Sequence, residues 1–182
     1  MRTKGPRPWS ALAFLGVLTL GSAALGEGAR GMRQGTRPGF FEASVGPVVG
    51  LLNTDRLWAQ SSLEIGGHLQ GSSAGPALSG SFDFLGRHDW FGMEMGLKFR
   101  WDIQVRRGLA LYLAPTARAG YAFYTHKLDR PRHYFNLQFG FELRMIFRNR
   151  LIVFVRIFSF DFNIFDHVEV AFDTGVGIGV SF

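Results

Sequence analysis

Near its C-terminal end, the sequence combines the residue types that acyl-transfer chemistry requires. Ser159 and Asp161 alternate in one stretch, and His167 and Glu169 alternate in the next. A hydroxyl, an imidazole base and an orienting carboxylate are the groups that activate a nucleophile for attack on an ester or amide. Polar residues at every second position also form the polar face of any half-buried strand. These four residues are therefore the catalytic candidates of the sequence. Of the two interpretations, the sequence favours the one in which they are polar residues of a strand without a catalytic role.

A second group of candidate residues is basic and lies in residues 124–133, "YTHKLDRPRH". Its positively charged and imidazole side chains are His126, Lys127, Arg130, Arg132 and His133. Such donors bind phosphate groups through charge-assisted hydrogen bonds. One acidic residue, Asp129, lies among them, and the alternative, which the sequence favours, is an ordinary solvated loop.

The composition excludes several other kinds of chemistry. The chain has no cysteine, so it can form no disulfide, no thiolate metal site and no cysteine nucleophile. Its formal net charge is +6, but the basic residues are scattered and no phosphate-cradling loop is present, which argues against nucleic-acid binding. No cofactor or metal site is expected.

The positions of these groups depend on the elements around them, and those elements follow a period of two, which is typical of strands. The clearest example is residues 90–101, "WFGMEMGLKFRW". The alternation recurs in eight segments, which are 41–51, 62–70, 78–84, 90–101, 109–121, 134–147, 151–164 and 167–182. In 151–164 the alternation slips by one position, which predicts a β-bulge near Ile157 or Phe158. The sequence predicts an all-β fold.

The two faces of these segments differ in a way that predicts their surroundings. One face carries glycines and charges of both signs, and the other carries large apolar residues with no Asp, Glu, Lys or Arg. Glycine weakens a water-exposed strand but fits the narrow interior of a small barrel. A charge on a lipid-facing surface costs about 2–4 kcal/mol near the midplane of the bilayer. We therefore expect lipid on the apolar face, with Trp90 and Trp101 as girdle residues at the two interfaces of the membrane.

The ends of the chain and the connections predict its organisation. A basic start, an apolar run over 11–20 and small residues at Ala24 and Gly26 predict a cleaved signal peptide, residues 1–26. Residues 27–39 are glycine-rich and predict a flexible leader, followed by the barrel over 40–182. The longest predicted connections, 53–62 and 124–133, follow the first and fifth segments. They predict that the odd-numbered connections are the long outer loops.

Together these features resemble the small eight-stranded transmembrane barrels of the OmpA/OmpX type, with an antiparallel up-and-down meander. The apolar positions before the terminal Phe182 resemble the C-terminal signature that the barrel-assembly machinery recognises in that family. The resemblance implies residence in the outer membrane of a Gram-negative bacterium and contact with its lipids. If the basic segment lies on the outer surface, its donors could bind the phosphates of lipopolysaccharide.

Three functions follow from these expectations. The leading hypothesis is a non-enzymatic outer-membrane barrel that supports envelope integrity or surface interaction through its outer loops. The first alternative is a lipid A-modifying acyl hydrolase or acyltransferase barrel that uses the candidates around Ser159 and His167. The second alternative is a soluble secreted lipid-binding barrel, which would alternate in the same way with its apolar face inward.

Overall fold

The computed structural model describes residues 37–52, 57–70, 74–88, 90–106, 110–126, 131–148 and 150–182. The predicted signal peptide over 1–26 and nearly all of the predicted leader over 27–39 lie outside these ranges. Gly39, which we assigned to the leader, already belongs to the first strand.

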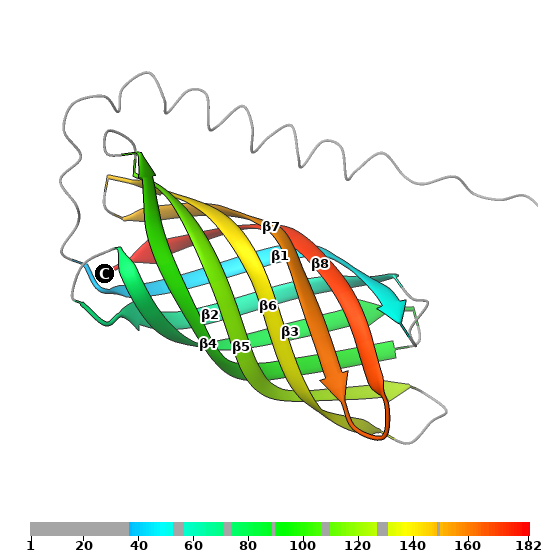
Figure 1. The fold of residues 1–182 in the computed structure, drawn as a ribbon. Coiled ribbons are helices and arrows are strands. Elements are labelled where there is room, and N and C mark those ends of the chain that lie inside the picture. The colour runs from blue at the N-terminus through cyan, green and yellow to red at the C-terminus, as the bar shows by residue number, and fades with distance from the viewer. Residues whose placement is uncertain are drawn as a thin grey trace, which may run out of the picture. The chain divides into compact units, whose positions relative to one another are not determined.

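The described residues form a closed barrel of eight antiparallel strands in sequential order (Figure 1). The strands are β1 (Gly39–Leu52), β2 (Leu57–His68), β3 (Gly75–Arg87), β4 (Trp90–Arg106), β5 (Leu111–His126), β6 (Arg132–Phe147), β7 (Leu151–Ile164) and β8 (Val168–Ser181). The predicted fold class, an up-and-down eight-stranded meander, is confirmed.

Closure of the sheet joins the first strand to the last. The backbone amide of Gly39 donates to the carbonyl of Phe182 at 2.9 Å, and the amide of Phe182 donates to Gly39 at 2.8 Å. The two ends of the barrel chain therefore meet, as Figure 1 shows. We call this end of the barrel the terminal end, and the end that carries the connections after β1, β3, β5 and β7 the distal end.

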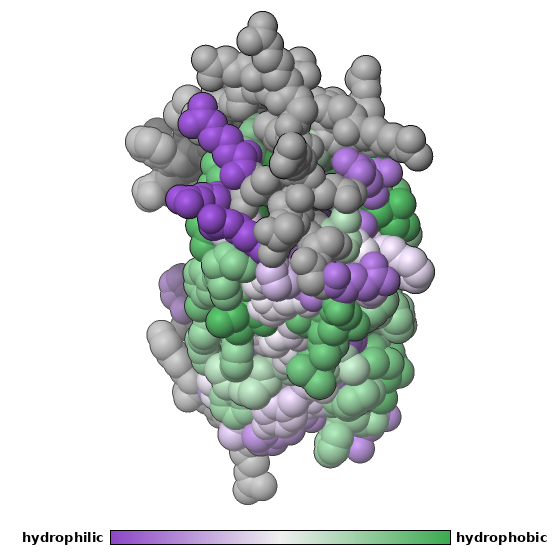
Figure 2. Space-filling view, turned by 90° about the vertical axis from the view of Figure 1, so that its left-hand side faces the viewer, coloured by the Kyte–Doolittle hydropathy of each residue, from purple (hydrophilic) through white to green (hydrophobic). Residues whose placement is uncertain are grey.

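The outside of the barrel is apolar. Leu97 at the middle of β4 is 65% exposed and Ile178 in β8 is 62% exposed. Among the strand residues whose burial the structure describes, no Asp, Glu, Lys or Arg occupies an outward position. On the face shown in Figure 2, hydrophobic residues form broad areas, and hydrophilic residues gather above and below them. The prediction that the large apolar face of the strands points outward is confirmed.

Helices play no part in this surface. The described part of the chain contains no helix that is long and apolar enough to cross a bilayer.

The predicted β-bulge is present in β7. Phe141 of β6 pairs with Phe158, but the next residue, Glu142, pairs with Arg156, so Ile157 is the extra residue. The register with β8 shifts at the same place. The bulge keeps Arg156 and Ser159 both inside the barrel although they are an odd number of positions apart.

The predicted loop lengths are wrong. β2 already begins at Leu57, β5 continues to His126, and β6 starts at Arg132. The connections after β1 and β5, at the distal end, are therefore shorter than expected. The longest interval between strands is 69–74, at the terminal end. The error arose because inward polar residues such as Gln60, which is 5% exposed, resemble loop residues in the sequence.

The girdle prediction is also wrong for Trp90. Trp101 points outward and is 52% exposed, but Trp90 packs inside the barrel against a buried cluster that contains Val48, Trp58 and Leu85. Trp90 lies in the inward phase of β4, so its ring contributes to the interior of the distal end.

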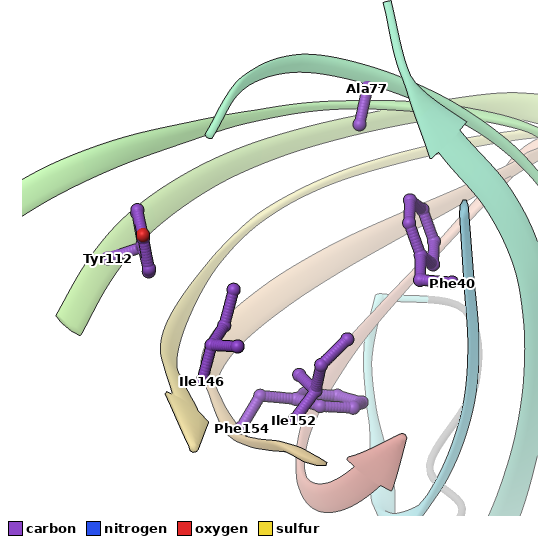
Figure 3. Packing of buried hydrophobic residues seen from close by; sticks show 6 residues of the cluster. All are labelled: Phe40, Ala77, Tyr112, Ile146, Ile152 and Phe154. Carbon is purple, nitrogen blue, oxygen red and sulfur yellow. The ribbon is translucent and has the colours of Figure 1, made fainter. Parts of the chain in front are cut away.

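The terminal end of the interior is closed by apolar side chains (Figure 3). This apolar cluster consists of Phe40, Ala77, Tyr112, Ile146, Ile152 and Phe154. The guanidinium of Arg100 lies 4.2 Å from the centre of the Phe40 ring, and that of Arg144 lies 5.2 Å from the Phe154 ring. These cation–π contacts join the cluster to the charged groups above it.

The charged groups next to this cluster form one continuous network, which we call the central network. It contains the carboxylates and bases Glu42, Glu64, His68, Lys98, Arg100, Asp102, Glu142, Arg144, Arg156 and Asp173. Lys98 lies 2.8 Å from Glu64 and 2.7 Å from Glu142. Buried charges are tolerated only when paired in this way. The network therefore fills the lumen without leaving an isolated charge.

The apolar outside predicts a position-dependent cost for an added charge. Leu97→Arg should destabilise the membrane-inserted barrel by about 2–4 kcal/mol, because Leu97 lies at mid-strand and faces the lipid core. Leu69→Arg is the matched control, since Leu69 is 64% exposed but lies in the turn after β2. Its cost should stay below about 1 kcal/mol. Urea unfolding in lipid vesicles measures both values, and equal costs would contradict a lipid-facing surface.

The central network predicts a large loss of stability when one cation is removed. Arg144→Met removes one cationic partner from each of Glu42, Asp102 and Glu142 and should cost about 3–5 kcal/mol. Adding Glu42→Gln to this variant should recover part of that loss. Arg150→Met, in the exposed turn after β6, is the control and should change the urea midpoint little. A similar midpoint shift in both single variants would argue against the network as a source of stability.

Candidate functional site

A candidate site is a cavity of about 520 Å³ inside the distal end of the barrel, which we call the rim cavity. It is lined by Val48, Gly50, Trp58, Leu85, Arg87, Trp90, Glu94, Tyr124, Arg132, Tyr134, Asp161, Asn163, Glu169 and Ala171. A volume in this range suits a small organic ligand. Every strand except β1 contributes a charged or aromatic side chain to it, so the closed sheet itself positions the site.

Four aromatic rings form a continuous wall of this cavity. Trp90 contacts Trp58, Trp58 contacts Tyr124, and Tyr124 contacts Tyr134, with ring centres 6.0, 5.9 and 5.7 Å apart. The planes of successive rings meet at 76°, 59° and 77°. Rings at such angles enclose space from several sides rather than stacking flat. We call these four residues the aromatic wall.

A glycine on β4 makes room for one of these rings. A Cβ atom at Gly92 would lie 2.6 Å from the Cδ1 atom of Tyr124, which is closer than atoms can approach. Gly92 and Tyr124 are direct partners across the β4–β5 ladder. The phenol ring of Tyr124 therefore occupies the space that a side chain at position 92 would fill.

Three carboxylates, Glu94, Asp161 and Glu169, line the same cavity, and we call them the acidic floor. The hydroxyl of Tyr124 donates to Glu94, and the hydroxyl of Tyr134 donates to Glu169 at 3.0 Å. The aromatic wall and the acidic floor are thus linked by hydrogen bonds, which fix the orientation of both.

A second charged cluster lies directly beneath the acidic floor, around the single guanidinium of Arg118. Arg118 contacts Asp83 and Glu94, and its Nη2 atom lies 3.4 Å from Asp161. It also donates to Asn136, at 3.2 Å from Nε and 2.8 Å from Nη2. Three carboxylates therefore share one cation at this level, and all four side chains are buried.

The mouth of the cavity carries two exposed arginines, Arg87 and Arg132. Arg132 belongs to the predicted anion-binding segment, of which Lys127 and Arg130 lie outside the described residues. His133 points outward, and its ring contacts Tyr121 through a hydrogen bond. His126 is half-buried, with its ring centre 4.5 Å from that of Trp90. The described members of the segment are thus divided between the inside and the outside of the barrel.

The catalytic candidates are divided in a different way. His167 lies in the exposed turn after β7, with its Nε2 atom 3.2 Å from Glu169. Ser159 is buried, and its hydroxyl has no hydrogen-bond partner among the described residues. Ser159 lies inside β7, where it pairs with Asp173 of β8, and the turn that carries His167 begins only after Ile164. Roughly 16 Å of strand therefore separates Ser159 from the level of His167. The structure brings His167 to Glu169 and Asp161 to Arg118, but it does not bring the hydroxyl to the imidazole.

Sequence reasoning missed most residues of the rim cavity. Trp58 was assigned to a loop, and Tyr124 and Tyr134 were not singled out as inward aromatic residues. The available signal was the inward phase of Trp90 together with the alternation of Trp58 and Gln60 with Leu57 and Ala59. Within the described ranges, no group of three or more His, Asp or Glu residues is arranged to hold a metal ion.

Comparison with known proteins identifies the architecture. No protein-family model matches the chain, and no curated protein matches it. Among solved structures, Neisserial surface protein A (NspA) matches with a TM-score of 0.65 and 9% identity, over 83% of this chain and 100% of the other. The N-terminal β-barrel domain of Pseudomonas aeruginosa OprF matches with a TM-score of 0.57 and 14% identity, over 80% and 99%.

A third similar structure is Ail, the attachment invasion locus protein of Yersinia pestis, with a TM-score of 0.50 and 16% identity, over 80% of this chain and 99% of the other. At such low identity these similarities concern the fold alone. The closed meander, the apolar outside and the three structural matches together establish that the chain has the fold of the small eight-stranded outer-membrane barrels.

Proposed function

We propose that this protein is a non-enzymatic integral barrel of a bacterial outer membrane that supports the envelope and presents its distal end for surface interactions. The observation that carries the proposal is the continuous apolar outer surface around a charged interior. A soluble lipid-binding barrel would need the opposite arrangement, with apolar side chains inside.

The interior also argues against transport of hydrophobic molecules. The small cavity between the central network and Arg118 has a volume of about 10 Å³, enough for about one water molecule. The apolar cluster around Phe40 and Phe154 occupies the terminal end below it. Passage of a solute through the lumen would require the paired charges to separate, at a cost of several kcal/mol per ion.

The separation of Ser159 from His167 supports the non-enzymatic interpretation over the lipid A-modifying alternative. A nucleophile must lie within about 2.6–3.2 Å of its base for the base to take its proton. Ser159 lies well below the turn that carries His167, and Asp161 is engaged by Arg118. These positions suit structural roles inside the barrel.

The partners proposed for the protein are outer-membrane lipids, among them lipopolysaccharide. Arg132 is exposed at the distal end, and Lys127 and Arg130 are its neighbours in sequence. Guanidinium and ammonium groups bind phosphates through charge-assisted hydrogen bonds. Two of the similar structures are described as a surface protein and an attachment protein. In this proposal Phe182, which is 59% exposed, is the residue that the assembly machinery recognises.

Cell fractionation tests the location and the absence of lipid chemistry together. The full chain, expressed in a Gram-negative host, should be found in the outer-membrane fraction and migrate differently on a gel before and after boiling, because closed barrels resist detergent unfolding. The lipid A of strains with and without the gene should have identical acyl chains by mass spectrometry. An altered acyl pattern that Ser159→Ala or His167→Ala abolishes would refute the non-enzymatic role, and a soluble product would refute the membrane location.

Lipopolysaccharide contact predicts a local effect of charge removal. Arg132→Gln should weaken binding of lipopolysaccharide to the purified protein by about two- to fivefold, since an exposed ion pair contributes less than about 1 kcal/mol. Arg150→Gln, at the terminal end, is the control and should leave binding unchanged. Co-sedimentation at low and high salt measures both. Equal loss in the two variants would indicate an effect of net charge and contradict a site at the distal end.

A further inference from the structure

The charged side chains in the lumen include more carboxylates than cationic groups. In the central network, five carboxylates face four cationic side chains and His68. Around Arg118, three carboxylates face one guanidinium. Glu169 adds a further carboxylate at the level above. With Arg87 and Arg132 at the mouth of the cavity included, four carboxylates face three guanidinium groups, so one carboxylate is in excess among the described residues at and beneath the rim cavity.

The position of this excess matters because the carboxylates can reach a guest. Glu94 and Asp161 both contact Arg118 and also line the rim cavity. The second oxygen of Glu94 accepts from the hydroxyl of Tyr124, and Asp161 also forms a hydrogen bond with Asp173, so both groups are held in place at the border of the cavity. A positive group in the cavity would be attracted to them, and more strongly than in bulk water because the site is largely enclosed.

The walls of the cavity indicate which kind of cation fits. The aromatic wall presents four rings at steep angles to one another, and the negative faces of such rings attract cations within about 6 Å of the ring centre. Val48, Leu85 and Ala171 add apolar surface. A bare metal ion would require several oxygen ligands at short distance, whereas an alkylammonium group gains from both the rings and the apolar surface.

We propose that the rim cavity is a binding site for small molecules that carry an alkylammonium group, which the aromatic wall surrounds and the acidic floor neutralises. The two arginines at the mouth, Arg87 and Arg132, then face the outer part of the ligand. They favour ligands in which an anionic group, such as a phosphate, follows the ammonium group. This inference goes beyond a general surface role, since it assigns a ligand class to a defined site.

The test uses the full-length protein purified from membranes in an uncharged detergent, because a zwitterionic detergent would compete for the site. The probes are choline, phosphocholine, inorganic phosphate and 3,3-dimethyl-1-butanol, which has the shape of choline without its charge. Tryptophan fluorescence reports on the site because Trp58 and Trp90 line it, and calorimetry gives the affinity. Choline and phosphocholine should bind, and the neutral analogue should bind about tenfold more weakly or not at all.

Variants locate the binding. Trp90→Leu removes one ring of the wall, and Glu169→Gln removes one charge at a half-buried position, so neither disturbs the contacts of Arg118. Each should weaken choline binding by about tenfold. Trp101→Leu, which changes the lipid-facing tryptophan of the same strand, should leave it unchanged. Heat-modifiable migration confirms that each variant is folded.

Four results would overturn the proposal. These are absence of choline binding, equal affinity for choline and its neutral analogue, tighter binding of inorganic phosphate than of choline, and unchanged choline affinity in both folded cavity variants. The second result would indicate a merely apolar cavity, and the third an anion site formed by the arginines at the mouth.

Discussion

The structure depends on one constraint, which is that every backbone amide and carbonyl of a strand in lipid needs a hydrogen-bond partner within the protein. The barrel meets it by pairing β1 with β8, so that the sheet has no edge. Closure then forces each strand to present one face to the outside of the barrel and one to the lumen. The apolar outside and the polar inside are two consequences of the same backbone requirement. The polar inside in turn determines which side chains fill the lumen.

A narrow lumen has room for charged side chains only if they neutralise one another. The central network does so closely: Arg144 contacts Glu42, Asp102 and Glu142, and Lys98 joins Glu64 to Glu142. With the apolar cluster at the terminal end, it forms a solid plug. The distal half differs, because its rings enclose a cavity instead of filling it. The barrel is therefore built from a compact terminal half and a more open distal half, and only the latter can accommodate a ligand.

The sequence predicted the fold well and the site poorly, and the reason is physical. Alternation within one strand determines which face a residue occupies, so the barrel, the apolar outside and the bulge at Ile157 could all be predicted. Register between strands is not encoded by alternation. Ser159 and His167 share a phase yet lie at different levels, and the pair formed by His68 and Asp102, 2.6 Å apart, joins non-adjacent strands. Inward polar residues also resemble loop residues, which hid the start of β2.

The distribution of charge also bears on why three carboxylates surround Arg118 in the distal half of the barrel. A buried carboxylate that shares a guanidinium with two others is less well neutralised than one with its own partner, and this lowers stability. An amide at Asp161 could still accept a hydrogen bond from Arg118 without adding negative charge. Stability alone therefore does not account for three carboxylates at this level, beside a cavity walled by aromatic rings. A positively charged guest in that cavity would supply the missing countercharge, and the cost to the empty barrel would become part of the binding free energy.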